Sequence, residues 1–275
     1  MAVPAFLDAP FRFQESQISD VQIIIDNLYD ELVTNPASAN KWTCTLGGKT
    51  QSPTAFKSPT RSDGVFFTIN CTRISQTRIA YVVRDAAGLL VNNDTDTRQD
   101  IRAGSSIWVR LYTGPFYVVV DSGGATAGTP ECWAAGVLDR TPEPLGMPRA
   151  CYYASAGPRR NSDGALQNNT GRPWFTLKVG ATSYAIDSYA IIDTRSPYTN
   201  QYIDRYTVAG TLCFLPMEVI DTEYLLGRMF NWLMTDWGLV NQAEYTVPLD
   251  GNTTGVFKIL GLAAGYSSKF AVRKS

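Results

Sequence analysis

Between Lys41 and Thr211 the sequence is a succession of short segments rich in Val, Ile, Tyr and Phe, separated by turn residues. Such segments are typical of β-strands, and their spacing indicates a sandwich or a barrel. We therefore expect a mainly β fold with two accessory helices (α+β class) and a sandwich- or barrel-like core. The predicted strands are Trp42–Leu46, Val65–Cys71, Arg78–Arg84, Leu89–Asn92, Ile107–Tyr112, Phe116–Asp121, Cys132–Leu138, Ala150–Ala154, Trp174–Val179, Tyr184–Ile192 and Tyr206–Phe214.

Residues Ser16–Thr34 carry the periodicity of an amphipathic helix. Their apolar residues recur at spacings of three and four, which places them on one helix face: Ile18, Val21, Ile25, Leu28 and Leu32. Ser16 or Ser19 is expected to cap this helix, with Asp20 in its first turn, and Asn35-Pro36 to end it. Such a helix is expected to pack on a sheet or against a neighbouring subunit.

The C-terminal part of the chain changes character. A second helix is predicted over Asp221–Trp237, with apolar residues around much of its girth, so it is expected to be buried in a core or in a subunit interface. Two strands, Glu244–Leu249 and Val256–Leu260, are expected to follow as a hairpin. The basic tail from Lys269 to Lys274 is expected to be short and frayed.

The N-terminal residues Ala2–Gln14 contain two Pro and three Phe without helical or strand periodicity. Pro4 and Pro10 favour an extended backbone, and an extended apolar arm cannot bury itself locally. We expect the arm to lie on a neighbouring subunit or on its own domain. The predicted organisation is therefore an arm and helix in residues 1–40, a β-rich core in residues 41–215, and a helix plus β-hairpin in residues 216–275.

Turn residues separate the predicted strands. Arg84–Gly88 and Tyr112–Pro115 are each expected to join two strands as a tight hairpin turn. Two longer polar segments interrupt the core: Asp139–Arg149 contains three Pro, and Gly157–Pro173 is rich in Asn, Gly and Arg. Long loops on a rigid β scaffold are where contacts to partners usually lie.

The chain contains no histidine, which removes the Ser-His-Asp and Cys-His nucleophile systems and the histidine-based zinc and iron sites. The run Asp121-Ser122-Gly123-Gly124 matches the surroundings of a serine-protease nucleophile, yet no histidine can activate Ser122. We interpret it as a strand ending in a glycine turn. We expect no catalytic residue and no enzymatic activity, while a histidine-free enzyme that uses paired carboxylates stays an open alternative.

Oxygen-bearing side chains are concentrated in Asn92–Asp100, which includes Asp94, Asp96 and Asp100. Calcium prefers several such oxygen ligands. Arg98, however, stands where an EF-hand loop needs an acidic residue. We expect an acidic hairpin tip and no metal site, and whether these acids hold an ion stays open.

The run Gly47–Thr50 has the Gly-Lys-Thr ending of a P-loop. Thr43 stands where the first glycine of that motif belongs, and Pro53 opposes the helix that must follow it. We therefore expect neither a nucleotide nor any other cofactor.

Lys and Arg together number 24 and Asp and Glu 25, which gives a formal net charge of −1. This balance provides no broad basic field, so no specific nucleic-acid partner is expected. The strongest local basic cluster is Arg159–Arg160 with Arg149 and Arg172, which we interpret as part of a solvated loop.

The five cysteines are scattered without metal-binding or redox spacing: Cys44, Cys71, Cys132, Cys151 and Cys213. Their odd number, together with the lack of a signal-peptide pattern over Met1–Asp8, predicts free thiols in a reducing compartment. No apolar run reaches the roughly 18 residues of a membrane-spanning helix, so no membrane partner is expected.

Arg61–Phe67, Thr77–Arg84, the predicted C-terminal helix and hairpin, the extended arm and the Asn- and Thr-rich turns form a pattern over the whole chain. This pattern resembles structural proteins of tailed-bacteriophage virions. The resemblance carries no residue of known function. It implies a homo-oligomeric ring or lattice component, made in the host bacterial cytoplasm and located in the neck (the head–tail connector), tail or baseplate of the virion. The implied partners are further copies of the chain and other virion proteins, without a small-molecule substrate.

Two neighbouring functions also stay open. The chain can be a capsid decoration protein, or it can be a module on a viral fibre that binds a glycan or another ligand. The binding module requires an exposed aromatic patch, for which the segment near Gly157–Trp174 is the candidate.

Overall fold

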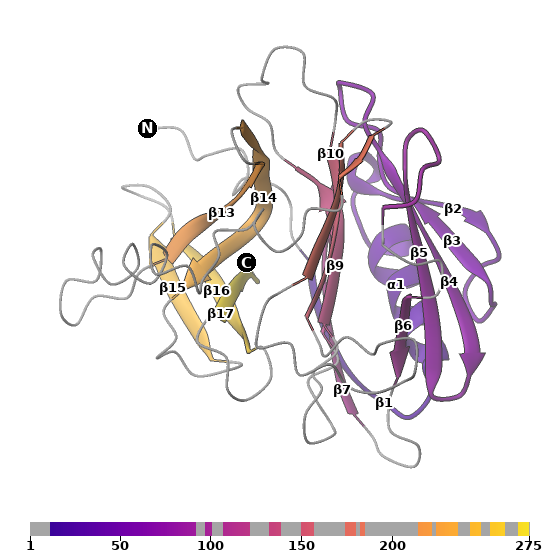
Figure 1. The fold of residues 1–275 in the computed structure, drawn as a ribbon. Helices are drawn as coiled ribbons and strands as arrows, with labels where there is room; N and C mark the ends of the chain where they lie inside the picture. The colour runs from indigo at the N-terminus through magenta and orange to yellow at the C-terminus, as the bar shows by residue number, and fades with distance from the viewer. Residues whose placement is uncertain are drawn as a thin grey trace, which may run out of the picture.

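The structure is a computed structural model, and it describes residues 12–91, 97–100, 107–121, 132–138, 150–156, 174–179, 182–184, 214–221, 224–235, 243–248, 254–261 and 269–274. These residues form three antiparallel β-sheets, with one helix between two of them (Figure 1). The fold is therefore mainly β and sandwich-like, as the sequence predicts.

The middle layer, sheet A, has seven strands in the order β1-β7-β8-β9-β10-β11-β12. Their bounds are β1 (Arg12–Ile18), β7 (Ile107–Gly114), β8 (Tyr117–Asp121), β9 (Cys132–Val137), β10 (Ala150–Ala156), β11 (Trp174–Val179) and β12 (Thr182–Tyr184). Strand β1 pairs with β7 along its whole length and forms one edge of the sheet. The predicted turn at Tyr112–Pro115 is confirmed, because it joins β7 to β8.

Sheet B covers one face of sheet A and follows chain order. It contains β2 (Thr43–Leu46), β3 (Thr54–Lys57), β4 (Phe67–Ser75), β5 (Arg78–Asp85) and β6 (Thr97–Asp100). The turn predicted at Arg84–Gly88 is confirmed: Gly88 has a φ of 80°, which glycine adopts without steric cost. The strand predicted at Leu89–Asn92 is wrong for its described part, because Leu90 makes only an isolated bridge to Arg84.

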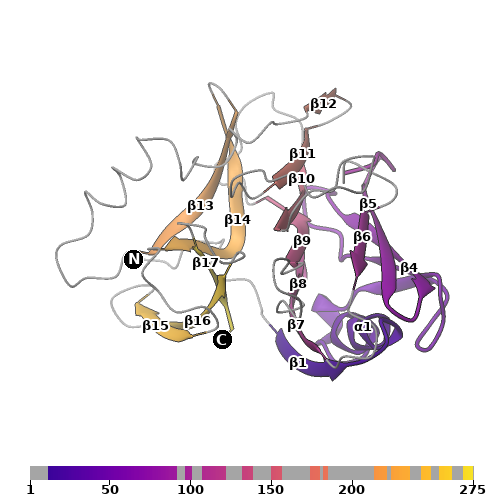
Figure 2. The ribbon, with the colours of Figure 1, turned by 60° about the horizontal axis from the view of Figure 1, so that its bottom comes forward.

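Sheet C lies on the opposite side of sheet A in both views (Figures 1 and 2). Its order is β13-β14-β17-β16-β15, with β13 (Phe214–Asp221), β14 (Tyr224–Thr235), β15 (Glu244–Pro248), β16 (Thr254–Gly261) and β17 (Lys269–Arg273). The predicted hairpin is confirmed as β15 and β16. The basic tail, predicted to be frayed, instead forms β17 in the centre of this sheet.

The helix predicted at Asp221–Trp237 is wrong. Asp221 ends β13, and most of the segment is β14, which pairs with β13 on one side and with β17 on the other. A run that is apolar at nearly every position fits a doubly paired strand as well as a buried helix. Strand β13 pairs along one edge of β14, and β17 pairs on the other edge with Trp232–Thr235.

The N-terminal helix begins later than predicted. Helix α1 (Gln22–Tyr29) continues into a π-helical turn, η2 (Asp30–Thr34), and Ser16 belongs to strand β1. Neither Ser16 nor Ser19 caps the helix; the carboxylate of Asp20 accepts a hydrogen bond from the backbone N–H of Gln22 at 2.7 Å. The segment before Ile18 is a strand because it pairs with β7 residue by residue. Of the predicted arm, residues 12–14 belong to β1 and residues 1–11 lie outside the described residues.

The main core lies between sheets A and B, and α1 closes it at one end (Figure 2). Ile24, Ile25 and Leu28 of α1 are fully buried there, with Phe67 and Tyr81 from sheet B. Sheet A contributes Val109, Leu111, Val118, Val120, Trp133, Val137 and Tyr153. Each such side chain contributes about 1.5–3 kcal/mol to the free energy of unfolding when folding removes it from water. The core between sheets A and B therefore stabilises the described fold more than any other part of it.

The other face of sheet A is also buried. Tyr112, Tyr117 and Val119 point away from sheet B and have no exposed surface. On this face the ring of Phe13 packs against that of Tyr112, its partner on β7, with centroids 5.1 Å apart. The Nζ atoms of Lys258 and Lys274 lie 5.1 and 5.0 Å from the centroid of the Phe13 ring. Cation–π contacts therefore join β16 and the residue that follows β17 to strand β1.

The strands predicted at Tyr184–Ile192 and Tyr206–Phe214 are each described at one residue only and stay predictions. Tyr184 ends β12 and Phe214 begins β13, so the remainder of Tyr184–Ile192 and Tyr206–Phe214 lies outside the described residues. Within the described residues, α1 and its π-helical extension are too short to cross a membrane.

Candidate functional site

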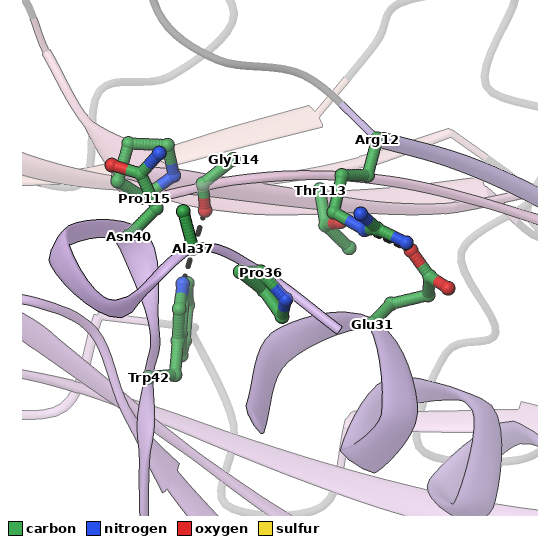
Figure 3. A pocket seen from close by; sticks show the side chains of 9 residues that line it. All are labelled: Arg12, Glu31, Pro36, Ala37, Asn40, Trp42, Thr113, Gly114 and Pro115. Atoms are coloured by element: carbon green, nitrogen blue, oxygen red, sulfur yellow. Dashed lines mark hydrogen bonds and ion pairs between the residues drawn. The ribbon is translucent and has the colours of Figure 1, made fainter. Parts of the chain in front are cut away.

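A small pocket opens where β1 begins, beside the turn between β7 and β8 (Figure 3). It has a volume of about 210 Å³ and is lined by Arg12, Glu31, Pro36, Ala37, Asn40, Trp42, Thr113, Gly114 and Pro115. Its walls come from β1, from η2 and the short 3-10 helix η3 (Ser38–Asn40), and from the end of β7. The site therefore depends on segments that are up to about a hundred residues apart.

Glu31 supplies a buried carboxylate to this pocket. It lies in the π-helical turn, which the backbone N–H of Asn35 closes by donating to the carbonyl of Asp30 at 2.9 Å. One carboxylate oxygen accepts a hydrogen bond from Nε of Arg12 at 2.7 Å, and the other accepts one from the side-chain amide of Asn35 at 3.0 Å. A buried carboxylate is tolerated only with such partners, so the pair fixes both side chains.

Arg12 is the polar group that the pocket offers to solvent. Its side chain is 41% exposed, whereas that of Glu31 is 8% exposed. Only Nε of Arg12 is engaged, and its two terminal amino groups have no hydrogen-bond partner among the residues described. A guanidinium fixed at Nε presents its remaining donors in a defined plane, which suits a carboxylate or a peptide carbonyl.

Trp42 forms the apolar back of the pocket. Its indole N–H donates to the carbonyl of Gly114 at 3.0 Å, and its ring meets Phe67 edge-on with centroids 5.0 Å apart. Its backbone N–H donates to the carbonyl of Leu32 at 2.8 Å. These contacts join the end of the helix to the β7–β8 turn and hold the tryptophan rigid. Pro36 and Pro115 complete the wall, as Figure 3 shows.

The arrangement is suited to binding rather than to proton transfer. It combines one fixed guanidinium with a rigid wall of tryptophan and proline. Pockets for cofactors and drug-sized ligands usually measure about 300–1,000 Å³, so this one matches a side chain or a short peptide segment better. Among the described residues no group of three or more Cys, Asp or Glu side chains is placed to hold a metal ion.

Sequence reasoning did not identify this pocket. Pro36 was recognisable only as a helix stop, Trp42 as a strand residue and Gly114-Pro115 as a turn. No local spacing connects Arg12 to Glu31, because a strand and a helix separate them and their contact arises from tertiary packing. The one available signal was that a proline and a tryptophan follow the end of the helix. The same pattern is ordinary for a turn, so it did not indicate a pocket.

The residues that resembled a P-loop form a loop between β2 and β3, so a strand and not a helix follows them. Lys49 is held by Asp30, with Nζ 2.7 Å from Oδ2, and this hydrogen bond raises the pKa of the lysine. The backbone N–H of Thr50 donates to Asp26 at 3.0 Å. The loop therefore serves to fasten sheet B to the helix.

Other predicted features lie partly or wholly outside the described residues. Residues 92–96, including Asp94 and Asp96, are outside, while Asp100 belongs to β6. Ser122, the basic cluster of Arg149, Arg159, Arg160 and Arg172, and the loops over residues 139–149 and 157–173 are outside as well. Cys44, Cys71 and Cys151 are free thiols, as predicted.

A second charged group crosses sheet A on the face toward sheet C. Glu15, Arg110 and Asp121 stand opposite one another on β1, β7 and β8. Nε of Arg110 lies 2.6 Å from Oε1 of Glu15, and its Nη1 lies 3.8 Å from Oδ2 of Asp121. The side chains of Arg110 and Asp121 are 12% and 5% exposed, which indicates a structural rather than a ligand-binding role.

A scan against protein-family models found no family that matches this chain, and a search of curated proteins found no similar sequence. The interpretation of the site therefore rests on its own geometry.

Proposed function

We propose that the chain is a structural subunit of a tailed-bacteriophage virion and forms a homo-oligomeric ring or collar in the neck, tail or baseplate. Its partners are further copies of itself and other virion proteins. The proposal assigns it no catalytic role, because the chain lacks histidine and the carboxylate of Glu31 in the pocket is already held by Arg12 and Asn35.

The observation that carries the proposal is the position of β1. It is the edge strand of the central sheet, and it pairs with β7 alone among the described strands. An edge strand presents unpaired backbone groups that can pair with another chain. The apolar residues 1–11 directly precede this edge strand in the sequence, and we propose that they contact an adjacent copy.

An exposed tryptophan lies beside this edge. Trp108 of β7 stands opposite Gln17 of β1, and 49% of its surface is exposed. Large aromatic side chains are enriched in protein–protein interfaces. Trp108 and the β1 edge together provide an apolar anchor next to a pairing strand, as an interface between subunits requires.

The way in which β1 is held also supports a structural role. On one face of this strand Arg12 pairs with Glu31, and on the other face Phe13 contacts Lys258 and Lys274. A subunit that bears load at its edge strand needs that strand fixed to the rest of the molecule.

The direct test is the mass of the purified protein by light scattering, followed by electron microscopy of the same fractions. We expect a discrete ring whose mass is a multiple of 30.2 kDa. A monomer at every concentration up to the solubility limit would contradict the proposal.

Substitution of Trp108 tests the interface. Trp108→Ala should dissociate the oligomer while leaving the thermal unfolding of the subunit nearly unchanged, because half of this side chain is already exposed. Leu46→Ala is the matched control, since Leu46 is 50% exposed on the edge strand of sheet B. Equal effects of both variants on the oligomer mass would remove the role assigned to Trp108.

A further inference from the structure

The pocket beside Arg12 has the properties of a site for a peptide. It offers the terminal amino groups of Arg12, which have no hydrogen-bond partner in the described part of the chain, next to a rigid wall formed by Pro36, Trp42 and Pro115. Arginine recognises carboxylates through two parallel hydrogen bonds. The occupant that fits should therefore carry one acidic group beside small or proline side chains.

The N-terminal arm has this chemistry. Within residues 2–11 the sole charged side chain is Asp8, and it is followed by Ala9 and Pro10. Ala and Pro side chains are small enough for a volume of about 210 Å³. The proline is already restricted in its backbone, so it loses little conformational freedom when it is bound.

The short distance along the chain between Asp8 and Arg12 favours the arm of a neighbouring copy, rather than the chain's own arm, as the occupant of the pocket. Asp8 precedes Arg12 by four residues, which corresponds to about 13 Å in an extended chain. Pro10 disfavours a helical turn at Ala9 and so favours extended backbone at this point. In an extended conformation Asp8 would be separated from the pocket that its own Arg12 lines, which makes an adjacent subunit the better donor of the arm.

We infer that the pocket binds Asp8-Ala9-Pro10 of the N-terminal arm of a second copy, with the Asp8 carboxylate on the terminal amino groups of Arg12. The inference rests on the proposed oligomer and names the contact that joins its subunits. Each copy then donates an arm to one neighbour and receives an arm from the other, which is a head-to-tail contact that closes into a ring.

Disulfide trapping between full-length chains tests this contact. One copy carries Ala9→Cys and a differently tagged copy carries Ala37→Cys, and the two are co-expressed and oxidised gently. We expect a covalent dimer of both tags, because Ala37 lines the pocket and is exposed. The control replaces Ala37→Cys by Ala39→Cys, which is exposed in the same 3-10 turn but does not line the pocket.

In the alternative arrangement, the arm occupies the pocket of its own chain. It is tested by placing Ala9→Cys and Ala37→Cys in one chain. If that double variant forms only an intrachain disulfide, and the mixed copies form none, the arm occupies its own pocket and the inference is overturned. The control variant also measures the background from the native cysteines, which is to be subtracted.

Charge substitutions supply the second readout. Asp8→Asn should raise the apparent dissociation constant of the oligomer about tenfold, the loss expected for a charge-assisted hydrogen bond. Asp8→Glu, which keeps the charge, should lie closer to the unmodified protein. An oligomer that forms normally with Asp8→Asn and gives no trapped dimer would overturn the inference while the proposed function stands. A chain that is monomeric at all concentrations would overturn both.

Discussion

Gly136 of β9 stands directly opposite Tyr152 of β10, and a Cβ atom on Gly136 would lie 2.7 Å from the Tyr152 hydroxyl oxygen. It would also lie 2.7 Å from the carbonyl oxygen of Phe116. Tyr152 is 1% exposed, so its ring fills the space that a side chain at position 136 would need. We expect Gly136→Ala to lower the free energy of unfolding by about 1–3 kcal/mol, as overpacking of a core does. Urea denaturation followed by tryptophan fluorescence measures the change.

The cause is tested by a double-mutant cycle with Tyr152→Ala. If the overlap with the tyrosine ring is responsible, Tyr152→Ala should cost less in the Gly136→Ala background than in the unmodified protein. A coupling of at least about 0.5 kcal/mol is expected for residues in direct contact. Additive effects of the two substitutions would show that the destabilisation arises elsewhere.

Arg110 is expected to be one of the most sensitive positions in the sheet. Arg110→Met removes the cation shared by the buried carboxylate of Asp121 and the partly exposed carboxylate of Glu15. Breaking a buried pair from one side typically costs about 3–5 kcal/mol, because an uncompensated charge remains. Thermal or urea unfolding measures this loss. Arg110→Met with Asp121→Asn should be less destabilised than Arg110→Met alone, since the second change removes a buried charge.

The control for Arg110 is Arg84→Met. Arg84 is exposed on β5, and its Nη1 donates to the carbonyl of Gly88 at 2.8 Å. We expect this substitution to change the free energy of unfolding by less than about 1 kcal/mol, as is usual at the surface. If Arg110→Met were as mild as Arg84→Met, the row Glu15–Arg110–Asp121 would not stabilise the fold.

Arg73 should make stability depend on pH below neutrality. Its Nε and Nη2 donate to the carboxylate of Asp20 at 3.0 and 2.9 Å, and these hydrogen bonds are the main cause that lowers the pKa of Asp20. The folded state then binds fewer protons than the unfolded state. The stabilisation is complete above the ordinary Asp pKa of 3.8 and is lost as the pH falls through the lower folded value.

Arg73→Gln tests this dependence. The free energy of unfolding at pH 7 should fall only slightly, because the Arg73 side chain is 37% exposed and solvent screens the pair. The difference from the unmodified protein should disappear in the acid range, where Asp20 is protonated in both states. Arg84→Gln serves as the control, and its effect should not vary with pH. A constant difference for Arg73→Gln would exclude the ion pair as the cause.

Cysteine labelling should distinguish the thiol in the main core from the thiol on the edge strand of sheet B. Cys71 is fully buried in the main core, and burial raises the pKa of its thiol, whereas Cys44 is half-buried on edge strand β2. Because the thiolate is the reacting species, iodoacetamide should modify Cys44 at least about tenfold faster than Cys71 in the folded protein. Mass spectrometry of the peptides measures both rates. In denaturant the rates should converge, and equal rates without denaturant would contradict the burial of Cys71.

The sequence predicted β2, β4 and β5 of sheet B and β7 to β11 of sheet A, where alternation and turn residues agree, but it missed β1, β3 and β6. Strand β5 was predicted at Arg78–Arg84 and spans Arg78–Asp85, and its turn ends at Gly88 with positive φ. These features are local, because side-chain alternation and the conformational freedom of glycine act within a few residues. The central part of the N-terminal helix, from Gln22 onward, was predicted for the same reason.

The errors share a physical cause. Residues 16–18 carry apolar spacing that suits a helix, but β7 provides a partner strand for them. The segment 224–235 is apolar at most positions and fits either state, and β13 and β17 decide in favour of a strand. Strand β17 itself comes from a tail of basic character. A strand is stabilised by a partner that can lie anywhere in the chain, and its own residues do not reveal that partner.

The sequence by itself determined the β-rich class of the fold, most of its turns, the free state of the described thiols and the lack of histidine chemistry, because each depends on residue type or on neighbours along the chain. The tertiary structure alone decided the three layers, the edge position of β1 and the pocket that joins Arg12 to Glu31 and Trp42. These depend on long-range contacts, since hydrophobic burial is non-directional and strand pairing selects among many segments of equal propensity.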